Sequence, residues 1–81
     1  MARHNRKCFI VKRRKNILKV LADIDNGKAT YNHILEVLKS QGYRISEKEL
    51  RNDCNLLRML RLLEKVKNGV VITQKGRALV L

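Results

Sequence analysis

The sequence predicts a mostly α-helical domain with a small β-hairpin, which is an α+β fold. The chain has no Pro and only four Gly among 81 residues, a composition that favours helices. Apolar residues recur at helical spacing in three segments, and Asn68-Gly69 lies between two apolar runs, as is typical of a hairpin turn. A chain of this length has room for one domain with one modest core.

The first predicted helix covers residues 16–25, and an earlier start at Lys12 stays open. Its apolar side chains follow one stripe of a helix, namely Ile17, Leu18, Leu21 and Ile24. A turn cluster at residues 25–28 ends this helix, since Asp, Asn and Gly favour turns.

The second predicted helix begins after Thr30, whose hydroxyl is expected to cap it. Its buried stripe consists of Ile34, Leu35 and Leu38. Gly42 is expected to end the helix in the left-handed conformation. The short connection over residues 43–45 then joins it to a third helix, an arrangement that predicts a helix-turn-helix unit.

The third predicted helix spans residues 47–60 and begins with a capping box formed by Ser46 and Glu49. On a helical wheel its apolar side, expected in the core, consists of Leu50, Cys54, Leu57 and Leu60. The opposite side presents amide and basic groups, with Arg51 and Arg58 on its flank, and its centre consists of Lys48, Asn52, Asn55 and Met59. Asn and Arg side chains can each make two hydrogen bonds to a base edge, so this face is a candidate reader of DNA sequence.

The predicted hairpin has Asn68 and Gly69 as its two loop residues, because both positions of such a turn favour positive φ. Its basic tip consists of Lys65, Lys67 and Asn68. In this register Lys67 lies opposite Val70, while Val66 and Val71 share the other face. Thr73 is expected to cap a short carboxy-terminal helix.

Positive charge is concentrated at the amino end of the chain. The net charge is +12, and residues 1–15 hold seven Lys or Arg and no acid. We therefore expect a basic, partly ordered arm over residues 1–15 and a domain over residues 16–81. The apolar run at residues 8–11 is expected to dock on the domain or on a second subunit, or to extend the first helix.

Three segments together resemble the winged helix-turn-helix family, and more loosely the small regulators of archaea and their viruses. They read ATYNHILEVL, ISEKELRNDCNLLRMLRLLEKV and VVITQKGRALV, and the resemblance covers residues 16–81. It implies that residues 47–60 enter the major groove, that residues 65–70 form the wing, and that the start of the second helix touches phosphate. The sequence departs from the family at Arg61-Leu62, where the family usually has a glycine.

The expected DNA contacts fall into four groups. The recognition helix contributes Lys48, Arg51, Asn52, Asn55 and Arg58. The wing contributes Lys65, Lys67 and Asn68, and the start of the second helix contributes Tyr31 and Asn32. The arm contributes Arg3, Arg6, Lys7, Lys12, Arg13 and Arg14.

Other classes of function find little support in the sequence. No nucleophile lies in a recognisable group with a base, so we expect no enzyme and no cofactor. Cys8 and Cys54 lack the paired spacing of a zinc site, and whether they form a disulfide stays open. No apolar run approaches the roughly 20 residues of a membrane span. We expect a cytoplasmic protein with no membrane partner and no small-molecule ligand.

The leading interpretation is a homodimeric, sequence-specific regulator of transcription that binds double-stranded DNA. Its dimer seam is expected among apolar residues of the two chain ends, namely Phe9, Ile10, Val11, Leu79, Val80 and Leu81. Two alternatives stay open: a sequence-neutral architectural protein that binds DNA or RNA, and a winged-helix module that binds another protein.

Overall fold

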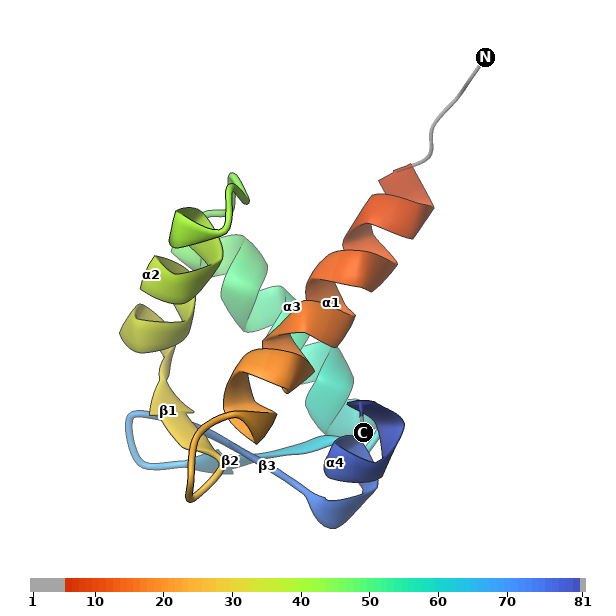
Figure 1. Cartoon of the computed structure of the whole chain (residues 1–81), viewed down its shortest axis with the longest axis vertical. Coiled ribbons are helices and arrows are strands. Elements are labelled where there is room, and N and C mark those ends of the chain that lie inside the picture. Colours follow the sequence, from red (N-terminus) through yellow and green to blue (C-terminus); the bar gives the residue numbers. More distant parts are fainter. Residues whose placement is uncertain (1–5, 81) are drawn as a thin grey trace.

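The computed structural model describes residues 6–80, with the side chains of residues 11–80. These residues form four helices and a three-stranded antiparallel sheet, which confirms the predicted α+β class (Figure 1). In chain order the elements are α1 (Arg6–Ala22), β1 (Lys28–Thr30), α2 (Tyr31–Ser40), α3 (Glu47–Met59), β2 (Leu63–Val66), β3 (Gly69–Ile72) and α4 (Gln74–Val80). The sheet lies at one end of the three longer helices, and α4 packs beside α1. No helix in this part of the chain is long and apolar enough to cross a membrane.

The helix α1 includes the apolar run at residues 8–11, so of the placements left open for that run the extension of the first helix is confirmed. It starts at Arg6 rather than at residue 12 or 16, and it ends at Ala22 rather than at residue 25. Residues 6–15 contain neither Gly nor Pro, so nothing in this segment interrupts a helix. The expected boundary between an arm and a domain at residues 15 and 16 therefore falls inside one continuous helix (Figure 1).

The start signals of the later helices are confirmed. The hydroxyl of Thr30 accepts a hydrogen bond from the His33 amide at 3.1 Å, at the start of α2. Ser46 and Glu49 form the reciprocal capping box at the start of α3. The Thr73 hydroxyl accepts a bond from the Gly76 amide at 3.0 Å, at the start of α4. Short polar side chains thus define three of the four helix starts.

The ends of α2 and α3 use the same left-handed backbone geometry with different residues. Gly42 has φ of +94° after α2, as the sequence predicted. After α3 the left-handed position is occupied by Arg61, with φ of +64°. The next amide, that of Leu62, donates to the Leu57 carbonyl at 2.9 Å. The turn after α3 thus forms without the glycine that would carry no steric penalty there.

The strand β1 is a feature that the sequence did not predict. Lys28 was expected in a turn and Thr30 as a helix cap, but residues 28–30 pair antiparallel with β3, so that Ala29 lies opposite Val70. The sheet order is β1-β3-β2, which makes β3 the central strand. A strand of three residues carries no periodic pattern, and it exists here because β3 offers an edge for pairing.

The hairpin turn differs from the predicted one. Val66 pairs with Gly69, so Lys67 and Asn68 are the loop residues, and of these Asn68 has positive φ. Gly69 lies instead in the central strand, where an added Cβ would stand 2.1 Å from the carbonyl oxygen of Ala29. Glycine is therefore needed at this position to let β1 approach β3, and the turn forms one residue earlier.

The new register changes strand partners but not the face of each side chain. Val70 lies opposite Lys65 rather than Lys67, which is a shift of two residues. Because side chains in a strand alternate with a period of two, such a shift preserves their faces. Lys65 consequently still shares a face with Ile72.

The core lies between the helices and the sheet. The buried apolar side chains from the helices are Ile17, Leu18, Val20, Leu21, Ile34, Leu38, Leu50, Cys54 and Leu57, the connection between α2 and α3 adds Ile45, and those from the sheet and its entry are Leu62, Leu63, Val70 and Ile72. Leu60 was expected in this core and is instead 51% exposed. It follows the last residue of α3, at the edge of the apolar face, where it lines an open groove between α1, α3 and α4.

Candidate nucleic-acid interface

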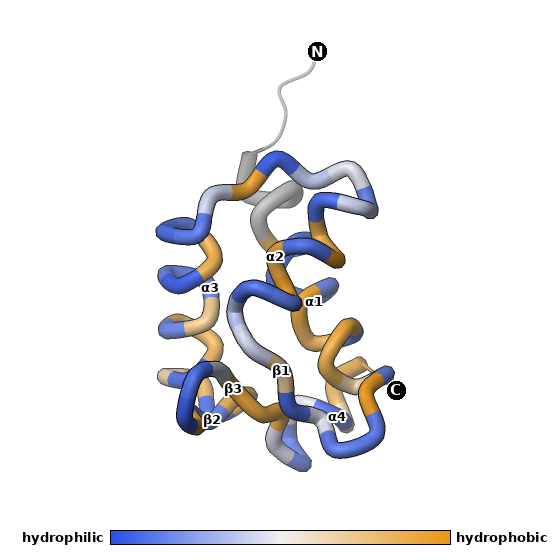
Figure 2. Tube along the Cα trace, turned by 90° about the vertical axis from the view of Figure 1, so that its left-hand side faces the viewer, coloured by the Kyte–Doolittle hydropathy of each residue, from blue (hydrophilic) through white to orange (hydrophobic). Residues whose placement is uncertain are grey.

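The outer face of α3 is polar and open to solvent, as the wheel predicted. Lys48, Asn52 and Asn55 are exposed along this face, and Met59 at its end is 78% exposed. Figure 2 shows the same division, with the hydrophilic parts of α3 on the side that faces away from the rest of the chain. Two amides and one ammonium are thus presented on a helix that its capping box and its buried face hold in place.

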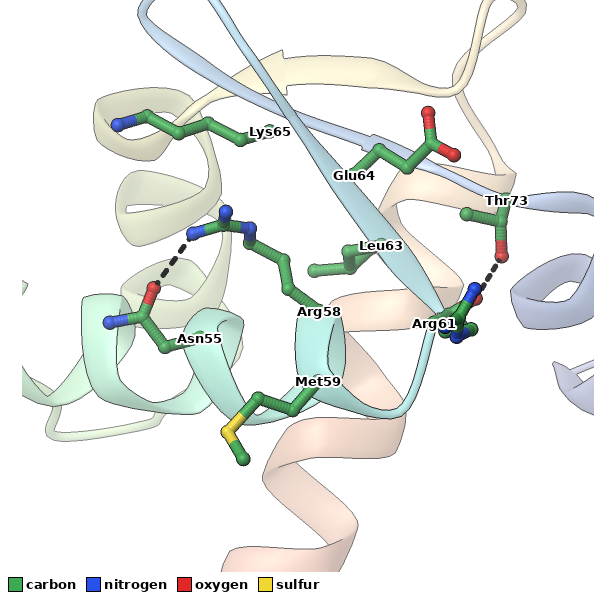
Figure 3. Close-up of a pocket in the computed structure, with 8 residues that line it drawn as sticks. All are labelled: Asn55, Arg58, Met59, Arg61, Leu63, Glu64, Lys65 and Thr73. Atoms are coloured by element: carbon green, nitrogen blue, oxygen red, sulfur yellow. Dashed lines mark hydrogen bonds between the residues drawn. The ribbon is translucent and has the colours of Figure 1, made fainter.

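Asn55 and Arg58 on this helix are joined to each other. The Arg58 guanidinium donates from Nη1 to the Asn55 side-chain oxygen at 3.2 Å (Figure 3). Both residues line a hollow of about 770 Å³ between the second half of α3 and β2. Lys65 enters from β2 on the side toward which Arg58 also extends (Figure 3). The hollow thus gathers the three cations Arg58, Arg61 and Lys65 and the amide of Asn55, with Glu64 at its far side.

A second hollow, of about 630 Å³, lies where the start of α2, the first half of α3 and the hairpin meet. The residues that line it are Thr30, Tyr31, Asn32, Glu47, Arg51, Lys65, Asn68 and Gly69. Tyr31, Asn32, Arg51, Lys65 and Asn68 were predicted as contacts from three separate segments, and the fold brings them together. Lys65 borders both hollows, whereas Lys67 is exposed at the loop.

Arg51 is held on two sides within this second hollow. Its Nε and Nη2 both donate to Oε2 of Glu47, one turn earlier in α3, at 3.1 and 2.9 Å. Its guanidinium carbon lies 4.6 Å from the centre of the Tyr31 ring, which is a cation–π contact. The side chain is nevertheless 54% exposed, so this arginine is oriented and still accessible.

The basic residues expected in the arm differ in burial and in ion pairing. Arg13 is only 7% exposed, because its Nε donates to Oδ2 of Asp53 at 2.7 Å. Arg14 donates to the other oxygen of the same carboxylate at 3.1 Å and is partly exposed. The expectation that Arg13 is free to contact a phosphate is therefore corrected, while Lys12 is exposed. Arg3 and the side chains of Arg6 and Lys7 lie outside the described part of the chain.

The sequence analysis did not identify two acidic residues of α3, namely Glu47, which lines the second hollow, and Asp53, which is buried outside the interface and is bonded to α1. Asp53 lies between the core positions Leu50 and Cys54, and a carboxylate on an apolar stripe signals a buried partner. Glu47 precedes Arg51 by four residues, the spacing at which opposite charges meet on a helix. The spacing identifies Arg51 as the partner of Glu47 on the same helix, whereas nothing in the sequence around Asp53 identifies its partner Arg13 on α1.

Two groups of α3, the Cys54 thiol and the Glu49 carboxyl, have pKa values shifted by burial and by helix capping. Burial raises the pKa of the Cys54 thiol to about 12, and this thiol is free and fully buried. Hydrogen bonds from the backbone and side chain of Ser46 lower the pKa of Glu49, which keeps the capping carboxylate ionised. Among residues 6–80 no three His, Cys, Asp or Glu side chains are grouped so that they could hold a metal ion.

Comparisons with protein-family models, with curated proteins and with solved structures found no match to this chain. The function proposed below consequently depends on the chain's own sequence and geometry.

Proposed function

We propose that this chain is a winged helix-turn-helix protein that binds double-stranded DNA at specific sequences and regulates transcription. The observation that carries the proposal is the exposed face of α3 with Lys48, Asn52 and Asn55, on a helix whose first half meets the start of α2 and a basic hairpin. In this proposal α3 enters the major groove, which has the width of one helix. The hairpin formed by β2 and β3 is then the wing.

The roles of the side chains follow from their chemistry. Asn52 and Asn55 carry both a donor and an acceptor, and such an amide can pair with the N6 and N7 atoms of adenine. Lys65 and Lys67 of the hairpin are suited to phosphate, as are Tyr31 and Asn32 at the start of α2. Phosphate contacts give affinity and register, while contacts to base edges give the choice of sequence.

The positive charge of the chain indicates that electrostatic attraction contributes much of its proposed affinity for DNA. A net charge of +12 on 81 residues attracts a polyanion, and binding releases the counterions that the DNA had condensed. We expect log K to fall linearly with log salt, with a slope of about −0.9 per phosphate neutralised. A slope near zero would contradict the proposal.

Two sets of substitutions separate choice of sequence from bulk affinity. Replacing Asn52 and Asn55 by Ala is expected to abolish preference among duplexes while leaving non-specific binding nearly unchanged. Replacing Arg3, Arg6 and Lys7 by Ala is expected to weaken binding to all duplexes alike and to reduce the salt slope. Fluorescence anisotropy with a preferred duplex and a shuffled one measures both effects. Identical behaviour of the two variants would exclude α3 as the reader.

The same titrations, with a folded RNA of the same length added, distinguish the rival functions. A sequence-neutral architectural protein would bind both duplexes with equal affinity, and an RNA-binding protein would prefer a folded RNA of the same length. A protein-interaction module would bind none of them specifically.

Homodimer formation is part of the proposal, because two copies can read two half-sites. Val11, Leu60 and Leu79 are exposed apolar residues that line one groove between α1, α3 and α4, and burial between two copies would remove them from water. Val80 is half-buried against the core, whereas Leu81 and the side chains of Phe9 and Ile10 lie outside the described residues. Sedimentation equilibrium is expected to give twice the chain mass, and Leu79→Ser is expected to shift the chain to the monomer.

A further inference from the structure

Arg51 differs from the other cations of α3 in how its donors are used. A guanidinium has five N–H groups, and Glu47 accepts one from Nε and one from Nη2 through a single oxygen. The remaining donors are the two of Nη1 and the second of Nη2. One hydrogen of each terminal nitrogen points away from Nε, so the outer edge of the guanidinium keeps a pair of parallel donors.

This free edge matches one base edge in particular. Guanine presents two acceptors side by side in the major groove, O6 and N7, and a guanidinium edge pairs with both. Adenine has an amino donor in place of O6, so the same pair of donors cannot be satisfied there. The contacts to Glu47 and to the Tyr31 ring fix the orientation of the edge before any ligand arrives, which lowers the entropic cost of binding.

The surroundings of Arg51 favour a base over a phosphate. The Glu47 carboxylate compensates the charge of the guanidinium and would itself repel a phosphate in direct contact. Lys65 and Asn68 border the same hollow, and in the described part of the chain neither is bonded to a carboxylate, so both are better suited to the phosphate backbone. The fold therefore gives the Arg51 guanidinium a fixed orientation, while Glu47 compensates its positive charge.

We infer that Arg51 is a specificity-determining residue that reads one guanine, and that Glu47 and Tyr31 are positioning residues that set its orientation. The inference depends on the proposed function, since it assigns a base to one residue of the same helix. The DNA site bound by this chain then contains an invariant G·C pair, at a position next to those read by Asn52 and Asn55.

Selection of bound sequences from a random duplex pool tests the assignment, with Arg51→Lys beside the unchanged chain. The unchanged chain is expected to select a motif with one strongly preferred guanine, and a single exchange of that G·C pair for A·T is expected to weaken binding about ten- to hundredfold. Arg51→Lys keeps the charge but loses the paired donors, so the preference at that one position is expected to disappear while the others remain. Arg44→Lys, a charge-conserving change at an exposed residue outside α3, is the matched control and is expected to leave the motif unchanged.

A second variant tests the positioning role. Glu47→Gln keeps Arg51 but weakens its anchor, so discrimination between guanine and adenine at that position is expected to fall severalfold while binding to a shuffled duplex stays equal or increases. A purely structural role of Glu47 in the first turn of α3 would lower stability without changing base preference. A motif that is identical for the unchanged chain and Arg51→Lys overturns the guanine assignment alone. Absence of any motif with the unchanged chain overturns the proposed function, and the assignment with it.

Discussion

Asp53 of α3 accepts a hydrogen bond from Arg13 of α1, with 2.7 Å between Oδ2 and Nε, and both side chains are almost completely buried. The other carboxylate oxygen accepts a bond from Arg14. This carboxylate lies on the side of α3 away from its exposed amides, so it fixes α3 against α1 without occupying the candidate interface.

Asp53→Ala is expected to lower the free energy of unfolding by about 3–5 kcal/mol, because it leaves the buried Arg13 guanidinium without a counter-charge. Arg14→Ala is the matched control, since Arg14 is a third exposed and retains access to water. We expect it to cost about 1 kcal/mol or less. Urea unfolding followed by circular dichroism measures both values, and an equal cost for the two variants would contradict the burial of the Arg13–Asp53 pair.

Gly69→Ala is expected to destabilise the sheet by roughly 1–3 kcal/mol or more, because the new methyl group would overlap the backbone carbonyl of Ala29. Backbone atoms of a paired strand cannot move aside cheaply, so β1 would have to separate from β3. Lys67→Ala, in the exposed loop two residues away, is expected to change stability by less than about 0.5 kcal/mol. A thermal midpoint unaltered by Gly69→Ala would exclude the close approach of β1.

Arg61 holds a left-handed backbone conformation after α3, which costs a non-glycine residue about 1–2 kcal/mol. Arg61→Gly removes this penalty, and Arg61→Val increases it because branching at Cβ is poorly tolerated there. We therefore expect the glycine variant to be the more stable of the two by at least about 1 kcal/mol, in the same unfolding experiment. The reverse order would show that the turn after α3 is not left-handed.

The Cys54 thiol is expected to be inert in the folded protein. Burial raises its pKa to about 12, so almost no thiolate exists at pH 8, and the side chain is inaccessible. In a Cys8→Ser background, which leaves one thiol, a disulfide reagent is expected to react only at the rate of unfolding. Rapid reaction in the absence of denaturant would contradict the packing of α3.

The same pKa shift has a consequence for stability at high pH. The folded state keeps its thiol proton up to about pH 12, whereas the unfolded chain loses it near the ordinary value of about 8.5. The contribution of this group is therefore fully present below about pH 8.5 and is lost progressively as the pH rises above it. Cys54→Ala is made in the Cys8→Ser background. It is expected to lessen the slope of the unfolding free energy against pH in that range, compared with Cys8→Ser alone.

Local signals in the sequence predicted much of the fold. The caps at Thr30, Ser46 and Thr73 and the left-handed stop at Gly42 were correct, because each depends on a side chain and its nearest backbone. The apolar stripes of the three longer helices were largely correct for the same reason, although Leu60 is exposed, Leu35 is only partly buried, and Ile24 is partly buried beyond the end of α1. Such features require no knowledge of distant residues.

Features that depend on distant residues were missed. The strand β1 exists only through pairing with β3, and the role of Gly69 depends on the backbone of Ala29, forty residues earlier. The burial of Arg13 depends in the same way on Asp53. Within the candidate site, exposure of Lys48, Asn52 and Asn55 followed from helical periodicity, whereas the contact between Arg51 and Tyr31 required the packing of two helices.

The most direct test of the central claim is the selection of sequences that the unchanged chain binds from a random pool of DNA duplexes. We predict an enriched motif with defined bases over the stretch that one helix spans in the major groove, and a loss of that motif when Asn52 and Asn55 are replaced by Ala. Tight binding without any enriched sequence would contradict the account, because α3 would then serve only as one face of a basic surface.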